Sequence, residues 1–94
     1  PINVGSDKIV CNVGDMLQRL TNDTLKSTTH RVSNPVGLGQ NQPRYSMPFF
    51  LHLNPDYIIK TLPNCIDENS PNKYQDAISA NEFLKIRLEE INLK

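Results

Sequence analysis

The segment from Arg44 to Leu53 is apolar at every second position, and this pattern constrains the fold more than any other in the chain. The alternating apolar residues are Tyr45, Met47, Phe49, Leu51 and Leu53. Because side chains of a β-strand point alternately to the two faces of a sheet, this period of two predicts a strand with one face on a core. Arg44, Ser46 and Phe50 share the opposite face.

Two earlier segments also predict strands. Residues 8–13 are rich in β-branched side chains, and residues 25–32 alternate between two largely polar faces. A short helix is expected between them, over 16–20, with Asp15 as its N-cap. The Thr-Asn-Asp sequence at 21–23 then supplies turn chemistry.

The last part of the chain predicts a connection followed by a helix. One further short strand is expected at Tyr57-Ile58-Ile59, and residues 61–78 form an irregular connection rich in Pro, Asn and charged residues. Ser79 and Glu82 have the spacing of a capping box, so the C-terminal helix is expected over 79–92.

Length, charge and hydropathy narrow the class of protein. The chain has 94 residues and a formal net charge of +0, whereas proteins that bind nucleic acids usually carry a basic excess, so no nucleic-acid partner is expected. The longest apolar run, from Met47 to Leu51, is far shorter than the ~20 residues that cross a bilayer, so no membrane partner is expected either. Two cysteines without a visible secretion signal favour a cytoplasmic location. A chain that begins at Pro1 rather than Met is expected to be a piece of a longer protein.

Three residues suggest a binding site on chemical grounds. His30 lies in the middle of the strand predicted at 25–32, and an imidazole suits a divalent metal. Arg44 and Ser46 lie on one strand face, and an Arg fork beside a hydroxyl suits a planar carboxylate. These residues would line a common cavity if both strands belong to one sheet system. The alternatives are a structural histidine and a solvated arginine at a sheet edge.

The segments that carry these residues resemble a known family. Residues 12–22 and 26–32, with the later Arg-Tyr-Ser-Met-Pro-Phe-Phe-Leu at 44–51, are similar to the C-terminal half of iron(II)- and 2-oxoglutarate-dependent oxygenases of the isopenicillin N synthase type. Shorter similarities follow in the tail and the closing helix, at Pro55-Asp56, Leu62-Pro63, Lys73-Tyr74, Glu82, Leu84 and Arg87. The resemblance covers nearly the whole chain.

The resemblance implies a fold. The expected fold is mainly β: the C-terminal half of a double-stranded β-helix, a cupin-like jelly roll, with a short internal helix and a C-terminal helix. Residues 1–94 would form one partial dioxygenase domain, with β-helix strands roughly over 1–60, the connection over 61–78 and the helix over 79–92.

The resemblance also implies roles for the candidate site residues. His30 would be one iron ligand of a two-His-one-carboxylate triad. Arg44 and Ser46 would hold the far carboxylate of 2-oxoglutarate, and Thr28 and Phe50 are candidates for lining the pocket. The expected enzyme is an oxidoreductase that couples oxidative decarboxylation of 2-oxoglutarate with O2 to hydroxylation, desaturation or ring closure of a small organic substrate. The expected cofactors are Fe(II) and 2-oxoglutarate, with ascorbate as a further candidate.

One departure from the family pattern limits this expectation. The other two iron ligands of the family form a His-x-Asp motif upstream, and none of the 29 residues before His30 is a histidine. The chain is therefore expected to be inactive alone and to need the N-terminal remainder of its parent protein as a partner. Two alternatives stay open: an oxidase of the same family that uses no 2-oxoglutarate, and a non-catalytic jelly-roll binding module.

Overall fold

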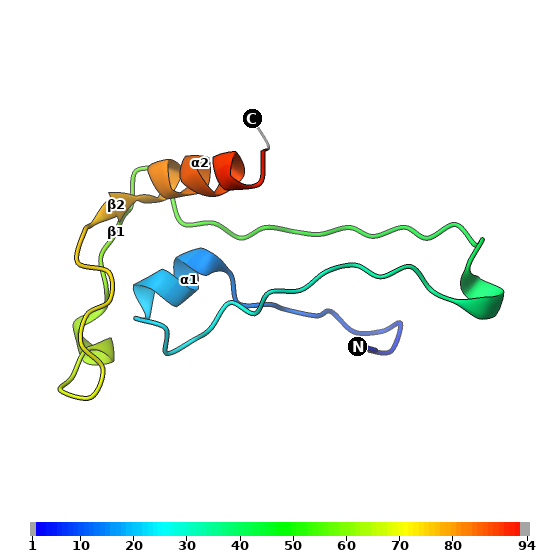
Figure 1. The fold of residues 1–94 in the computed structure, drawn as a ribbon, viewed down its shortest axis with the longest axis horizontal. Helices are drawn as coiled ribbons and strands as arrows, with labels where there is room; N and C mark the ends of the chain where they lie inside the picture. Colours follow the sequence, from blue (N-terminus) through cyan, green and yellow to red (C-terminus); the bar gives the residue numbers. More distant parts are fainter. Residues whose placement is uncertain (1, 93–94) are drawn as a thin grey trace.

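The computed structural model describes residues 2–92, which form two α-helices, two short strands and two single-turn 3-10 helices (Figure 1). In chain order these elements are α1 (Asp15–Leu20), η1 (Gly37–Gly39), β1 (Ile58–Ile59), η2 (Pro63–Cys65), β2 (Ile78–Ser79) and α2 (Ala80–Glu90). The two α-helices lie at one end of the molecule. Long extended segments run from this end toward η1 and back.

The packed end is built around a two-stranded antiparallel sheet. β1 pairs with β2 in a register that places Ile58 opposite Ser79 and Ile59 opposite Ile78. Ile59 and Ala80 are the buried apolar residues here, each 1% exposed. A backbone hydrogen bond of 2.9 Å from the Leu62 amide to the Leu20 carbonyl joins the end of α1 to the chain after β1. The core of the described residues is therefore small and local.

The capping box predicted at the start of α2 is confirmed. The Ser79 hydroxyl accepts a hydrogen bond from the Glu82 amide at 3.2 Å, and the Glu82 carboxylate accepts from the Ser79 amide. The two amides before Glu82 donate to the segment ahead of β1, Ala80 to the Tyr57 carbonyl and Asn81 to the Pro55 carbonyl. The amide groups that a helix N-terminus leaves unpaired are thus shared between the cap and a neighbouring segment.

The N-cap predicted for the first helix is wrong by one residue. Gly14 occupies the N-cap position with extended backbone, and no side chain caps the helix. Asp15 lies inside the first turn, where its negative charge interacts favourably with the positive end of the helix dipole. Its carboxylate forms a 2.7 Å ion pair with Arg87 of α2, so this residue links the two helices.

The three segments predicted as strands, 8–13, 25–32 and 44–53, are extended but unpaired (Figure 1). No backbone hydrogen bond joins any two of them within residues 2–92. The expectation of a mainly β fold is therefore not met by the described residues, whose strands are two residues long each. A β-strand forms only where a neighbouring segment hydrogen-bonds to its N–H and C=O groups. Within residues 2–92, no segment pairs with 8–13, 25–32 or 44–53 in this way.

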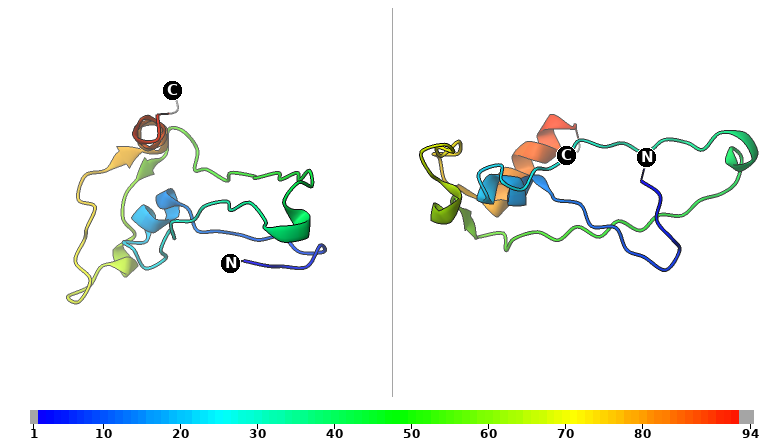
Figure 2. Two further views of the ribbon diagram at one scale, coloured as in Figure 1. Left: turned by 45° about the vertical axis from the view of Figure 1, so that its right-hand side comes forward. Right: turned by 90° about the horizontal axis from the view of Figure 1, so that it is seen from below.

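The extended segments also leave their apolar side chains in solvent. Tyr45, Met47, Phe49 and Leu51 are between 88% and 96% exposed, although their pattern predicted a buried face. The radius of gyration is 17.0 Å, compared with roughly 12 Å for a compact chain of this length. Two further views show the same segments projecting from the helical end (Figure 2). None of the helices described is long and apolar enough to cross a bilayer.

Candidate functional site

His30 lies on the extended segment that follows α1, and its side chain is exposed. Its ring nitrogen Nδ1 is 2.9 Å from the backbone carbonyl oxygen of Thr28. A carbonyl oxygen can only accept a hydrogen bond, so Nδ1 carries the proton and donates it. In the neutral ring, a proton on Nδ1 leaves Nε2 with its lone pair, which is the form in which histidine binds a metal.

The segment that carries His30 is held to α1 at its beginning. The Thr21 hydroxyl donates to the Leu17 carbonyl at 2.8 Å and accepts from the Leu25 amide at 3.2 Å. The side-chain oxygen of Gln18 accepts from the Ser27 amide, three residues before His30. The helix therefore fixes where this segment starts, a role that the sequence pattern did not predict for either side chain.

Arg44 and Ser46 lie on the segment that returns from η1, and both are exposed. Within residues 2–92, neither side chain has a hydrogen-bond partner, and neither forms a hydrogen bond or ion pair with His30. The extended segment that carries His30 and the one that carries Arg44 and Ser46 are connected through η1 (Figure 1). The structure thus places His30 and the Arg44–Ser46 pair on two consecutive extended segments without bringing them into contact.

The two candidate lining residues have different surroundings. Thr28 is exposed, and it is its backbone carbonyl, rather than its side chain, that binds His30. The Phe50 ring, 76% exposed, lies 6.1 Å from the His52 ring between centroids at a tilted angle of 57°. The described part of the chain holds no group of three or more His, Cys, Asp or Glu residues arranged for a metal ion. One candidate ligand, His30, is what these residues offer.

Comparison with known proteins identifies the class. The family model described as the 2OG-Fe(II) oxygenase superfamily matches residues 2–53, which is more than half of the chain and includes all the candidate site residues. The chain belongs to this superfamily of 2-oxoglutarate- and iron-dependent oxidoreductases.

Individual relatives agree with this assignment. The chain is 46% identical over 65 residues to the 2-oxoglutarate-Fe(II) type oxidoreductase hxnY of Emericella nidulans, a match that covers 69% of this chain and 18% of the relative. It is 40% identical over 82 residues to the proline hydroxylase buaE of Petromyces alliaceus, covering 85% of this chain and 26% of the relative. The chain therefore spans about a fifth to a quarter of the length of these relatives.

A solved structure extends the likeness to three dimensions. The crystal structure of a protein from Caulobacter crescentus, assigned to the 2OG-Fe(II) oxygenase family, matches with a TM-score of 0.80 and 56% identity. The match covers 85% of this chain and 26% of that one. This neighbour is consistent with the jelly-roll fold expected from the sequence, although the described residues themselves form few strands.

Proposed function

We propose that this chain supplies one iron ligand and the 2-oxoglutarate-binding pair of a non-haem iron oxygenase. His30 would bind Fe(II) through Nε2. The observation that carries this proposal is the hydrogen bond from His30 Nδ1 to the Thr28 carbonyl, because metal-binding histidines usually donate their second N–H to a carbonyl or a carboxylate. That bond fixes both the tautomer and the orientation of the ring.

Arg44 and Ser46 would bind the cosubstrate. They are two positions apart on an extended segment, so both side chains leave the same face of it. The guanidinium presents two parallel N–H donors that match the two oxygens of a carboxylate, and the Ser46 hydroxyl adds a third donor. Phe50 lies on the same face and would wall the pocket, while Thr28 would line it from the His30 segment.

These roles define a reaction class. Bound iron and 2-oxoglutarate would supply an oxidant from dioxygen, with 2-oxoglutarate converted to succinate and carbon dioxide. That oxidant would hydroxylate, desaturate or close a ring in a small organic substrate. The residues of this chain orient the two cofactors: His30 holds the metal and Arg44 fixes the far end of 2-oxoglutarate. Ascorbate remains a candidate further cofactor. We also propose a cytoplasmic location, which is compatible with the two free thiols, Cys11 and Cys65.

The site needs further protein to be complete. His30 is one ligand, and we propose that the N-terminal remainder of the parent protein adds the other two and strands that pair with the extended segments. The exposed face of Tyr45, Met47, Phe49 and Leu51 supports this partner. Burying each of these side chains contributes roughly 1.5–3 kcal/mol, so covering the face would favour association by about 6–12 kcal/mol before entropic costs. The chain alone should be inactive.

The test measures succinate formed from 2-oxoglutarate by the natural gene product, with Arg44→Ala, Ser46→Ala and Arg31→Ala compared. Arg31 is the matched control because it is an exposed arginine next to His30, on the opposite strand face. We expect Arg44→Ala to raise the KM for 2-oxoglutarate strongly, Ser46→Ala to raise it less, and Arg31→Ala to leave it unchanged. Turnover that needs no 2-oxoglutarate would favour the oxidase alternative, and a gene product without iron affinity would favour the binding module.

A further inference from the structure

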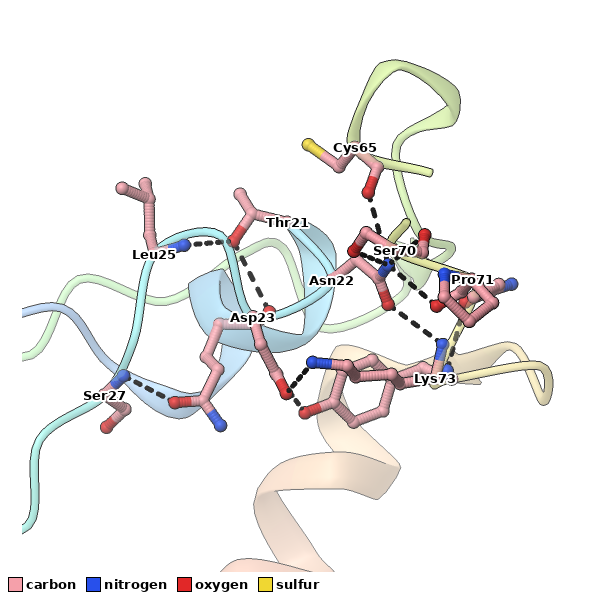
Figure 3. A network of polar contacts seen from close by, with 12 residues as sticks. Thr21, Asn22, Asp23, Leu25, Ser27, Cys65, Ser70, Pro71 and Lys73 are labelled. Atoms are coloured by element: carbon pink, nitrogen blue, oxygen red, sulfur yellow. Dashed lines mark hydrogen bonds and ion pairs between the residues drawn. The ribbon is translucent and has the colours of Figure 1, made fainter. Parts of the chain in front are cut away.

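The turn that precedes the His30 segment contains the most heavily hydrogen-bonded side chain described. Asn22 is 1% exposed, and its side-chain nitrogen lies 3.1–3.2 Å from oxygens of three residues in the connection after β1. These oxygens, which share the two N–H groups of the amide, are the carbonyls of Cys65, Ser70 and Pro71 and the hydroxyl of Ser70 (Figure 3). Its side-chain oxygen accepts from the Lys73 amide at 2.9 Å.

The backbone of this turn also specifies its residues. Asn22 and Asp23 have φ of 51° and 63°, in the left-handed region that few residues other than glycine tolerate. Asparagine and aspartate are the main exceptions, because their short polar side chains can bond locally. At position 22 the amide is needed as well, since a carboxylate has no N–H to give to the surrounding oxygens.

Asp23 adds a second link to the same connection. Its carboxylate accepts from the Tyr74 hydroxyl and forms a 3.2 Å ion pair with the Lys73 ammonium. The hydrogen bond from Tyr74 is the main cause that lowers the pKa of the Asp23 carboxyl, and the same bond raises the pKa of Tyr74. We call residues 21–23 together with their partners in 65–74 the clasp.

The clasp lies where the chain leaves α1 for the His30 segment. The Thr21 hydroxyl, one residue before Asn22, accepts from the Leu25 amide, and Gln18 accepts from the Ser27 amide. The turn is thus bonded to α1 on one side and to the connection on the other (Figure 3). The first residues of the His30 segment, Leu25 and Ser27, are held by side chains of the turn and of α1. Between Ser27 and η1, the described residues form no hydrogen bond between two backbone groups.

We propose that Asn22 and Asp23 are positioning residues for the metal ligand: the clasp sets the direction in which the chain leaves α1 and thereby the place of His30. This inference rests on the proposed role of His30 as an iron ligand. The connection after β1 carries none of the candidate site residues. Through its hydrogen bonds to Asn22, it would nevertheless help to place the metal ligand. Groups bonded directly to a metal ligand change metal affinity by about 10–100-fold. Asn22 contacts no atom of His30, so its effect on metal affinity should be smaller than that.

The experiment uses the natural gene product with two substitutions that break the clasp differently. Asn22→Asp keeps the shape and left-handed backbone but replaces the donor by a charge that faces oxygens in a buried place. Asn22→Gly keeps the backbone conformation and removes the side chain, so it serves if the charged variant fails to fold. Asn69→Asp is the control, because it adds the same charge in the same connection at an exposed side chain.

Two readouts are compared, amide hydrogen exchange and anaerobic Fe²⁺ affinity. We expect both Asn22 variants to speed exchange at Leu25 and Ser27 by about tenfold or more. They should also weaken Fe²⁺ binding measurably, by less than the roughly tenfold change that marks loss of a group bonded directly to the ligand. Asn69→Asp should change neither. Tyr74→Phe removes one bond to Asp23 and should give smaller changes in the same direction.

Two results would overturn the inference in distinguishable ways. If His30→Ala weakens Fe²⁺ binding but the Asn22 variants do not, the proposed function stands and the clasp does not position the ligand. If His30→Ala leaves Fe²⁺ binding unchanged, the proposed function itself fails, and the positioning role fails with it.

Discussion

The sharpest test of the packed end compares two neighbouring isoleucines in β1. Ile59 is 1% exposed and Ile58 is 53% exposed, although they have the same side chain and adjacent positions. Replacing Ile59 by alanine removes three buried carbon groups, which costs about 2.4 kcal/mol in transfer free energy at ~0.8 kcal/mol each. The cavity left behind adds to this, so we expect a loss of about 3 kcal/mol in the free energy of unfolding. Ile58→Ala should cost about 1 kcal/mol, because roughly half of its surface is already in water.

The assay is urea unfolding of the natural gene product and of each variant, monitored by the circular dichroism of the helices. The predicted difference between Ile59→Ala and Ile58→Ala is about 2 kcal/mol, and Ile59→Val should cost about 1 kcal/mol, close to the cost of Ile58→Ala. This difference arises because β1 buries the Ile59 side chain and leaves half of the Ile58 side chain in solvent. Equal losses for the two alanine variants, or a larger loss at Ile58, would refute that orientation.

Three further predictions follow from other parts of the chain. Ser79→Ala should lower the free energy of unfolding by about 1 kcal/mol through loss of the α2 cap, while Ser33→Ala, at an exposed serine, should not; equal shifts in urea midpoints would contradict this. Because the pKa of Asp23 is lowered in the folded state, its contribution to stability should be present above the ordinary carboxyl pKa and disappear as the pH falls through the lowered value. Tyr74→Phe should therefore destabilise the protein at pH 7 and progressively less in acid, and a deficit that stays constant with pH would be inconsistent with the bond. The 94-residue chain alone should self-associate through its exposed apolar face, so a monodisperse monomer in sedimentation would contradict the proposed need for further strands.

Local signals in the sequence predicted the local structure well. The capping box of Ser79 and Glu82 depends on residues three positions apart, and it forms as expected. The short helix after Gly14 also forms, but the predicted N-cap was wrong by one residue, since Gly14 takes that position. Asp15 pairs instead with Arg87 of α2, 72 positions away, a contact that no local pattern shows.

Pairing and long-range polar contacts were harder to predict. Alternation indicated extended chain over 44–53, and the backbone is extended there, but alternation does not say which segment provides the neighbouring strand. The pairing of β1 with β2 was not anticipated for the same reason. The turn at 21–23 was expected, whereas the partners of Asn22 lie 43 to 51 positions along the chain. The only sequence signal for that role was an Asn-Asp pair, which tolerates left-handed backbone.

For the candidate site, too, the sequence predicted the residues but not their hydrogen bonds. The residue types at positions 30, 44 and 46 and the family resemblance named the site, and the family assignment is confirmed. The tautomer of His30 became visible only through its bond to the Thr28 carbonyl, since a sequence does not show which ring nitrogen is protonated.

The most direct test of the central claim is an anaerobic titration of the natural gene product with Fe²⁺ and then with 2-oxoglutarate, by calorimetry. The account predicts that His30→Ala weakens Fe²⁺ binding by at least about a hundredfold, on the scale expected for loss of a metal ligand rather than of its supporting contacts. Arg44→Ala should keep the Fe²⁺ affinity and lose most of the 2-oxoglutarate affinity, while Arg31→Ala should change neither. Wild-type affinities in both the His30 and the Arg44 variants would contradict the claim that these residues hold the iron and its cosubstrate.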